Sequence, residues 1–332
     1  EKEQITNNLH ELNQILCLIA KISNHHYRTS NFNEKLEQIL LFFKKDIQNK
    51  FSNSEIYKIF MKNKRIILFL INQNILTIDK SIFNQIINSR TTFYFFPEMK
   101  NFLNEATIQK LSEEITEDFE EKRKTGENDS YICELIRKDL IDDFIMHVNQ
   151  NNLSLDSFIN YSPYETNAFL IGKKINLIEY SAFFGSIQIF NYLRLNNVQL
   201  TSSLWSYAIH GNNPEMIQIL EEKKISPNDE SYEKSIIESI KCYSNDVATY
   251  IIENFLQNEY DEMDEVVSKC FHSYNYTFIK KEFINEKYLY ELCKYDYFYF
   301  LKLLLEEDKS IDVNRIFSSN KNSPDQISNK IL

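Results

Sequence analysis

The sequence predicts an all-α protein in which antiparallel helix pairs stack side by side, and two observations carry that prediction. The 332-residue chain holds four glycines and five prolines, too few for the turns that a doubly wound α/β protein or an all-β domain needs. A short helix, a turn and a returning helix occur at residues 177–193 and again at 204–220. One such pair cannot bury its apolar face alone, so its repetition predicts a solenoid.

The N-terminal third is predicted to be a helical region with degenerate helix pairs. Apolar residues recur every three or four positions over residues 5–22, which indicates an amphipathic helix. We expect Asn33 to cap a second helix. From Ser54 a helix pair follows, in which Asn63 stands where a turn glycine would be expected. Residues 107–123 are highly charged and predict a helix with one solvent-facing side.

Three connecting segments resemble one another and support the repeat. Residues 72–79, 149–156 and 196–201 each offer an asparagine turn, an apolar anchor and a Ser, Thr or Asp that can cap the next helix. Segment 122–129 differs from them and is the best candidate for a linker or hinge. The chain is therefore predicted to divide into an N-terminal helical region, 1–125, and a solenoid, 130–332.

The predicted units of the solenoid vary in length. After a first pair near residues 132–148 they cover 176–200, 202–228, 231–258, a degenerate unit at 262–285, and 288–314. Their equivalent central residues lie 26, 32, 30 and 23 positions apart: Ala182, Ala208, Ile240, Cys270 and Cys293. We expect Ala182 and Ala208 to be buried where inner helices meet. Gly211 is expected to break its helix, and Ser162-Pro163 to start a connecting helix.

The distribution of charge and the cysteine pattern bear on nucleic-acid binding and on the cellular compartment of the protein. The net charge is −11, but residues 1–100 hold 14 basic and 9 acidic residues, a balance of +5, which leaves −16 for the remainder. An acidic remainder disfavours nucleic-acid binding. The five cysteines are scattered, without a C-x-x-C pair, which fits free thiols in a reducing compartment and predicts a cytoplasmic location.

The sequence offers no pattern for catalysis, cofactors, metals or membrane insertion. The longest run of Ile, Leu and Phe is 66–71, far short of the roughly 20 apolar residues of a membrane span, and the N-terminus lacks a signal-peptide pattern. Cysteines and histidines lack zinc-ligand spacing. We therefore expect no enzyme activity, no cofactor, no metal and no integral membrane segment.

Two units carry the residues of a known repeat motif, Ile178, Ser181, Ala182, Gly185, Ile189, Phe190, Tyr192 and Leu193, then Leu204, Tyr207, Ala208, Gly211, Met216, Ile217, Ile219 and Leu220. The last unit adds Leu289, Cys293, Phe300, Leu301, Leu303, Leu304 and the connector Ile311-Asp312-Val313-Asn314. These residues resemble the ankyrin repeat. The whole chain is similar to the large trichomonad group of ankyrin-repeat proteins, which carry an N-terminal helical domain of unknown function. The opening Thr-Pro is absent, and Tyr243, Ser273 and Asp296 stand in place of glycine.

The resemblance implies a non-catalytic scaffold that binds a protein partner through the concave face of an ankyrin solenoid. In that family the two residues between the small buried residue and the turn face the partner, which here are Phe183, Phe184, Ile209, His210, Lys241, Cys242, Phe271, His272, Lys294 and Tyr295. Five of the ten are apolar or aromatic, so we expect an exposed apolar stripe. The competing prediction is that Phe184 and Phe271 fold back into the core.

Two other functions remain open at this point. The chain would be a structural or anchoring protein if its basic N-terminal segment contacted an acidic partner or a membrane surface. It would be an enzyme of unrecognised type if a polar constellation outside known motifs were assembled by the fold.

Overall fold

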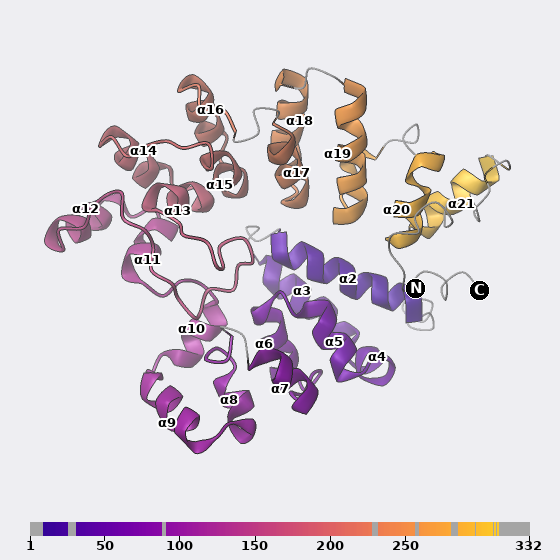
Figure 1. Ribbon diagram of the computed structural model, residues 1–332, viewed down its shortest axis with the longest axis horizontal. Coiled ribbons are helices and arrows are strands. Elements are labelled where there is room, and N and C mark those ends of the chain that lie inside the picture. Colours follow the sequence, from indigo (N-terminus) through magenta and orange to yellow (C-terminus); the bar gives the residue numbers. More distant parts are fainter. Residues whose placement is uncertain are drawn as a thin grey trace. The chain divides into compact units, whose positions relative to one another are not determined.

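The computed structural model describes residues 9–25, 31–87, 91–227, 232–255, 259–279, 285–295, 297–307, 309 and 311, and in these every regular element is a helix (Figure 1). The all-α prediction is confirmed. The chain forms two compact units, Glu1–Glu230 and Ser231–Leu332. The boundary between them lies near residue 230 rather than in segment 122–129.

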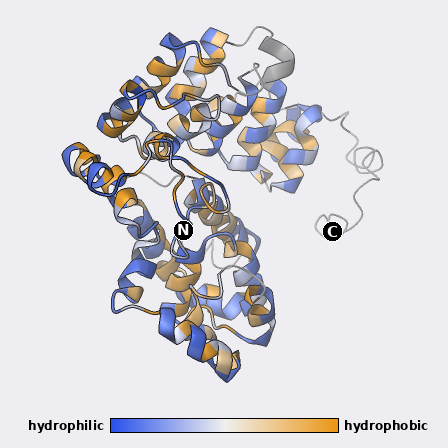
Figure 2. Ribbon diagram, turned by 60° about the vertical axis from the view of Figure 1, so that its left-hand side comes forward, coloured by the Kyte–Doolittle hydropathy of each residue, from blue (hydrophilic) through white to orange (hydrophobic). Residues whose placement is uncertain are grey.

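The first helices of unit 1 share one apolar core, and Figure 2 shows hydrophobic and hydrophilic residues alternating along them. They are α2 (Leu9–His25), α3 (Phe32–Phe42), α4 (Lys44–Lys50), α5 (Asn53–Phe60), α6 (Lys64–Asn72) and α7 (Lys80–Ile86). Leu12, Leu16 and Leu40 are fully buried in this core. The amphipathic helix predicted over 5–22 is confirmed from residue 9 onward, and Ile5 lies outside the described residues.

Two predictions about helix starts in this region are wrong, those for Asn33 and Asn63, whereas the helix pair expected from Ser54 is observed as α5 and α6. Helix α3 begins at Phe32, one residue before the expected cap Asn33. Helix α5 follows Ser52, whose side chain accepts from the Glu55 N–H. Asn63 has an extended backbone, with φ at −121°, and its Oδ1 accepts from the Ile66 N–H. It therefore caps the start of α6 instead of replacing a turn glycine, because asparagine serves both positions.

A group of shorter helices follows, consisting of α8 (Phe96–Met99), η1 (Lys100–Phe102), α9 (Glu105–Glu114) and α10 (Phe119–Thr125). The single helix predicted over 107–123 is thus two helices with a break near Ile115. No side chain of α9 is buried, which agrees with its expected exposure. Arg123 of α10 is 1% exposed and pairs with Glu98 at 2.6 Å and Glu120 at 2.9 Å. The segment expected to be a linker or hinge, 122–129, therefore begins inside a helix and is anchored by a buried side chain.

Three helix pairs make up the rest of unit 1. They are α11 (Tyr131–Arg137) with α12 (Ile141–Gln150), α13 (Leu177–Phe184) with α14 (Ile187–Leu195), and α15 (Leu204–Gly211) with α16 (Pro214–Glu222). The first helices pack in chain order, α11 on α13 and α13 on α15, and α12 packs on α14. Ala182 and Ala208 are buried, as predicted.

The predicted asparagine turns are confirmed in all three connectors, but the predicted helix cap is observed only in the first, where Asp79 accepts from the N–H groups of Ser81 and Ile82 before α7. No helix follows Asp156 directly, and Ser203, which precedes α15, makes no side-chain cap bond.

Asn74, Asn152 and Asn197 each follow the second helix of a pair and adopt a left-handed backbone, with φ of 54°, 48° and 65°. In each connector the next apolar residue donates its N–H to a carbonyl five residues earlier, in Leu70, Val148 and Leu193. This is the hydrogen bond of a Schellman cap, so one local device ends all three helices.

The connection between α12 and α13, residues 151–176, contains no helix, and the helix predicted from Ser162-Pro163 is wrong. Side chains hold its backbone in turns instead. Ser162 Oγ accepts from the Tyr164 N–H at 3.2 Å, and Asn167 Oδ1 accepts from the Phe169 N–H at 2.9 Å. Such local bonds from Ser and Asn compete with helix formation. The ends of the connection meet in an antiparallel bridge between Phe158 and Asn176.

Unit 2 repeats the pairing of helices, with α17 (Glu233–Lys241) against α18 (Asn245–Phe255) and α20 (Leu289–Lys294) against α21 (Phe298–Glu307). Between them lie α19 (Glu259–Ser273), η2 (Tyr276–Phe278) and η4 (Glu286–Tyr288). Phe271, Tyr288 and Tyr297 form the centre of an apolar core. Asp296 and the connector residues Asp312-Val313-Asn314 lie outside the described residues.

Candidate functional site

In unit 1 most residues of the predicted apolar stripe are buried in the core. Phe183 and Ile209 are 0% exposed, and His210 is 7% exposed. The reason is Phe169, which belongs to the 151–176 connection and lies over this face. Its ring stacks on that of Phe183, with centroids 5.7 Å apart, and lies 4.0 Å from that of His210. The exposed stripe is therefore a wrong prediction at these three positions, whereas Phe184 stays partly exposed.

In unit 2 the six remaining residues differ in burial. Phe271 is 0% exposed and packs in the core, and Cys242 is also buried, so the stripe is wrong at these two positions as well. Lys241 is half-buried and pairs with Glu238 at 3.1 Å. The others lie together at the surface: the rings of His272 and Tyr295 are 5.3 Å apart, and Lys294 Nζ is 5.3 Å from the Tyr295 ring.

Phe184, the partly exposed member of the set in unit 1, lines a cleft of about 760 Å³. The other walls come from α10, α11 and the segment that joins them. The charged side chains in this lining are Asp118, Glu121, Lys122, Glu127, Asp129, Glu134, Arg137 and Lys138. A cleft of this volume lies within the range that holds small ligands or a short stretch of a partner chain.

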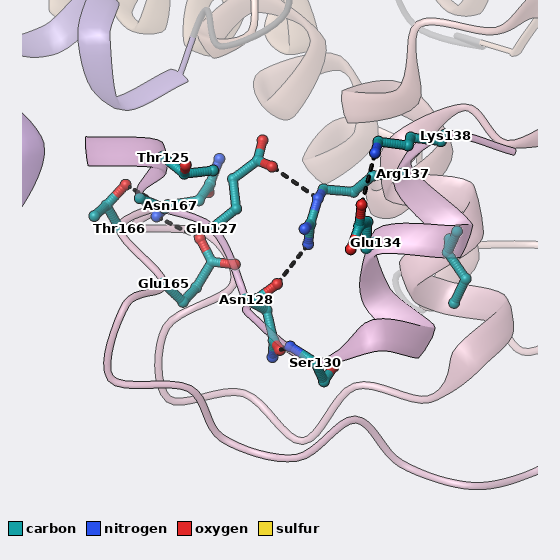
Figure 3. Close-up of polar contacts among 12 residues, drawn as sticks. Thr125, Glu127, Asn128, Ser130, Glu134, Arg137, Lys138, Glu165, Thr166 and Asn167 are labelled. Carbon is teal, nitrogen blue, oxygen red and sulfur yellow. Dashed lines mark hydrogen bonds and ion pairs between the residues drawn. The ribbon is translucent and has the colours of Figure 1, made fainter. Parts of the chain in front are cut away.

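Arg137 organises the cleft, as Figure 3 shows. Its Nε pairs with Glu127 Oε2 at 2.7 Å, and its Nη1 donates to the Asn128 carbonyl at 2.7 Å and to the Tyr180 hydroxyl at 3.1 Å. The planar guanidinium can serve three acceptors at fixed angles. Arg137 therefore ties the segment before α11 to helix α13.

The segment itself is bent by a glycine. Gly126 ends α10 with a left-handed backbone, φ 70°, and its carbonyl accepts from both the Thr166 N–H and the Thr166 hydroxyl. A Cβ on Gly126 would lie 2.9 Å from Thr166 Oγ1. Asn128 then turns the chain, since its Oδ1 accepts from the Ser130 N–H. These bonds fix the acidic and basic side chains of the cleft in place.

The chemistry of the cleft is that of paired surface charges. Lys122 pairs with Asp118 and Asp129, and Lys138 pairs with Glu134 at 2.6 Å. Cys133 lies behind this surface, and burial raises the pKa of its thiol to about 11. A thiol with that pKa is protonated at neutral pH and is a poor nucleophile. The arrangement suits recognition of a polar, charged surface.

The sequence analysis missed Arg137 and Glu127 as site residues. Glu127 fell within the expected linker, and Arg137 was one basic residue among many at a helix end. The signal that could have located the site is local. Gly126 is one of only four glycines, and an Asn-Asp-Ser run at 128–130 after it indicates a structured turn before a helix.

The chain was compared with protein-family models, with curated proteins and with solved structures, and none of them matches it. Within the described residues, no helix has both the length and the apolar character to cross a membrane.

Proposed function

We propose that this chain is a non-catalytic protein-interaction module, built as an ankyrin-like solenoid of stacked helix pairs. One observation carries the proposal: near three of the turns, a polar side chain donates to the backbone of the preceding pair. Ser186 donates to the Ile136 carbonyl at 2.5 Å and Asn213 to the Gly185 carbonyl at 3.4 Å. In unit 2 Asn275 donates to the Ile240 carbonyl at 3.0 Å.

This repeated bond supports a solenoid because it joins neighbouring elements in the same way at three places. Left-handed residues end the first helices at corresponding positions, at Gly185, Asn212 and Tyr243. Stacks of this kind fold around contacts between neighbouring repeats, which leaves the side chains at their surface able to vary. A stiff surface with variable side chains suits recognition of a protein.

The partner surface in unit 1 is assigned to the cleft beside Phe184. That side chain offers an aromatic anchor at the edge of the paired charges of Arg137 and Lys138. Aromatic residues and arginine are enriched among the residues that dominate binding energy at interfaces. In unit 2 the surface group His272, Lys294 and Tyr295 is assigned the same role.

The test uses the full chain as bait, followed by reconstitution with each purified partner. Phe184→Ala is expected to weaken binding by roughly 1–4 kcal/mol, as loss of an aromatic anchor does, while the melting temperature changes little. Phe183→Ala is the matched control, because its ring is buried and its loss should lower stability. Binding that Phe184→Ala and Lys138→Glu leave unchanged would exclude this cleft.

A further inference from the structure

A second cavity in unit 1, of about 750 Å³, differs in charge from the rest of the protein. It is lined by the α5–α6 turn, the start of α6 and the 159–175 part of the long connection. Four lysines line it, Lys62, Lys64, Lys173 and Lys174, against one carboxylate, Glu165. The whole chain carries 37 basic and 48 acidic residues. The charge of the side chains that line this cavity is therefore opposite in sign to the net charge of the chain.

Three of these lysines form no ion pair with the described residues. No described carboxylate lies within ion-pair distance of Lys62, Lys64 or Lys174, although the charge of Glu165 acts on Lys64. Lys62 and Lys174 are exposed, and Lys174 Nζ lies 3.9 Å from the centroid of the Phe158 ring. Elsewhere in unit 1 Lys122 and Lys138 do pair with acids. Lys62, Lys64 and Lys174 therefore place three cations together at one cavity.

Lys64 differs from the other two lysines because it is buried, with only 6% of its surface exposed. Its Nζ donates to the Pro163 carbonyl at 3.0 Å and lies 4.8 Å from the centroid of the Tyr94 ring. Burial lowers its pKa to about 8, and Glu165 acts against that shift. A buried ammonium held by one carbonyl and one ring is short of negative charge, and a bound carboxylate would supply it.

Hydrogen bonds hold the segment of the long connection that contacts Lys64. Glu165 Oε1 accepts from the Asn167 N–H at 2.8 Å, and Ser162 Oγ donates to Asp129 Oδ1 at 2.8 Å. Apolar and aromatic side chains supply much of the remaining lining, and three of them are well exposed, Met61 at 51%, Tyr161 at 58% and Ile171 at 40%. The cavity thus offers apolar surface beside a group of cations.

We propose that this cavity binds an acidic peptide segment, in which carboxylates pair with Lys62, Lys64 and Lys174 while neighbouring apolar side chains pack on Met61, Tyr161 and Ile171. The proposal goes beyond the interaction module described above, since it names a second site and the chemistry of its ligand. It does not require the cleft beside Phe184 to bind anything.

A peptide fits better than a nucleic acid for two reasons. A nucleic acid presents a continuous line of phosphates, which a chain of net charge −11 repels outside this one cavity. It also offers no aliphatic side chains for the exposed Met61 and Ile171. A peptide places carboxylates and apolar groups side by side, which matches the mixed lining.

The test measures binding of a fluorescent peptide of alternating Glu and Leu to the full chain at low salt. The double variant Lys62→Glu/Lys174→Glu is expected to weaken binding about tenfold or more, because it replaces attraction by repulsion. Lys58→Glu/Lys110→Glu makes the same change in net charge at exposed positions outside the cavity and should leave binding within about twofold. Phe184→Ala should also leave it unchanged.

Four results would overturn the proposal. The first is absence of peptide binding, and the second is equally tight binding of the matched peptide with Gln in place of Glu. The third is an equal loss of peptide affinity in the two double variants. The fourth is binding of oligothymidylate that is as tight as that of the peptide and is weakened equally by Lys62→Glu/Lys174→Glu. Melting temperatures of both double variants should match that of the parent chain, since the four lysines are exposed. Failure here would leave the Phe184 experiment unaffected.

Discussion

Gly211 packs directly against the backbone of Ala182. A Cβ on Gly211 would lie 2.1 Å from the Ala182 carbonyl oxygen and 3.2 Å from the Gly185 nitrogen. Gly211 is the last residue of α15, and the left-handed position falls to Asn212, with φ of 47°. The prediction that Gly211 breaks its helix is therefore wrong. Glycine is needed there because α13 and α15 approach each other closely.

Gly211→Ala is expected to destabilise unit 1 by roughly 1–3 kcal/mol, the usual cost of forcing extra atoms into a packed interface. Alanine would otherwise favour a helix, so any loss reports the contact with Ala182. Urea unfolding measures it. Ser112→Ala on the exposed helix α9 is the control, since it also introduces alanine into a helix but touches no packed interface. A Gly211→Ala variant as stable as the parent chain would contradict the close approach.

Ala182→Leu is expected to cost roughly 1–3 kcal/mol through overpacking between α13 and α15, and Ala208→Leu should behave alike. Both alanines are buried, at 0% and 1% exposure. Ala106→Leu on the exposed helix α9 makes the same chemical change without a packed neighbour and should be nearly neutral. Thermal unfolding of the three variants separates burial from intrinsic helix preference.

Arg137 and Lys138 are adjacent, and both are paired with glutamates, but their environments differ. Arg137→Met should destabilise the protein by about 3–5 kcal/mol, because Glu127 and the Asn128 carbonyl lose a partly buried partner. Lys138→Met should cost about 0–1 kcal/mol, since both members of its pair are exposed. Similar costs would mean that Arg137 does not organise the cleft.

Glu165 should make the protein less stable as pH rises. Burial raises its pKa from 4.5 to about 7, so between these values the folded protein keeps a proton that the unfolded chain has released. The free energy of unfolding therefore falls over this window and stays lower above it. Glu165→Gln should remove that fall when unfolding is compared at about pH 5 and about pH 7.5.

Glu134→Gln is the matched control for this pH dependence and has the opposite sign. Its hydrogen bond to Lys138 lowers the pKa of Glu134, so the parent gains stability as pH rises through the acidic range. The glutamine variant should lose that gain. A Glu165→Gln variant with the parent's pH profile would show that the side chain ionises normally.

Helices and their connectors could be predicted from the sequence because their causes are local. The apolar spacing of α2, the turns at Asn74, Asn152 and Asn197, and the small residues Ala182 and Ala208 each depend on neighbours within one or two turns of chain. The wrong predictions of local structure arose where one residue type is suited to two different positions in a helix pair. Asn63 and Gly211 are the examples, one capping a helix start and the other allowing a close approach.

The tertiary structure alone decided which of these elements leave a surface for binding. Phe183 and His210 are buried because Phe169, in a connection without helical periodicity, packs against both rings. Lys64 and Pro163 meet across 99 positions of chain. Contacts at that separation follow from how the helices pack, and no periodic pattern in the sequence records them. The sequence by itself determined an all-α repeat of helix pairs, and packing placed the cleft at Arg137 and the lysine-lined cavity.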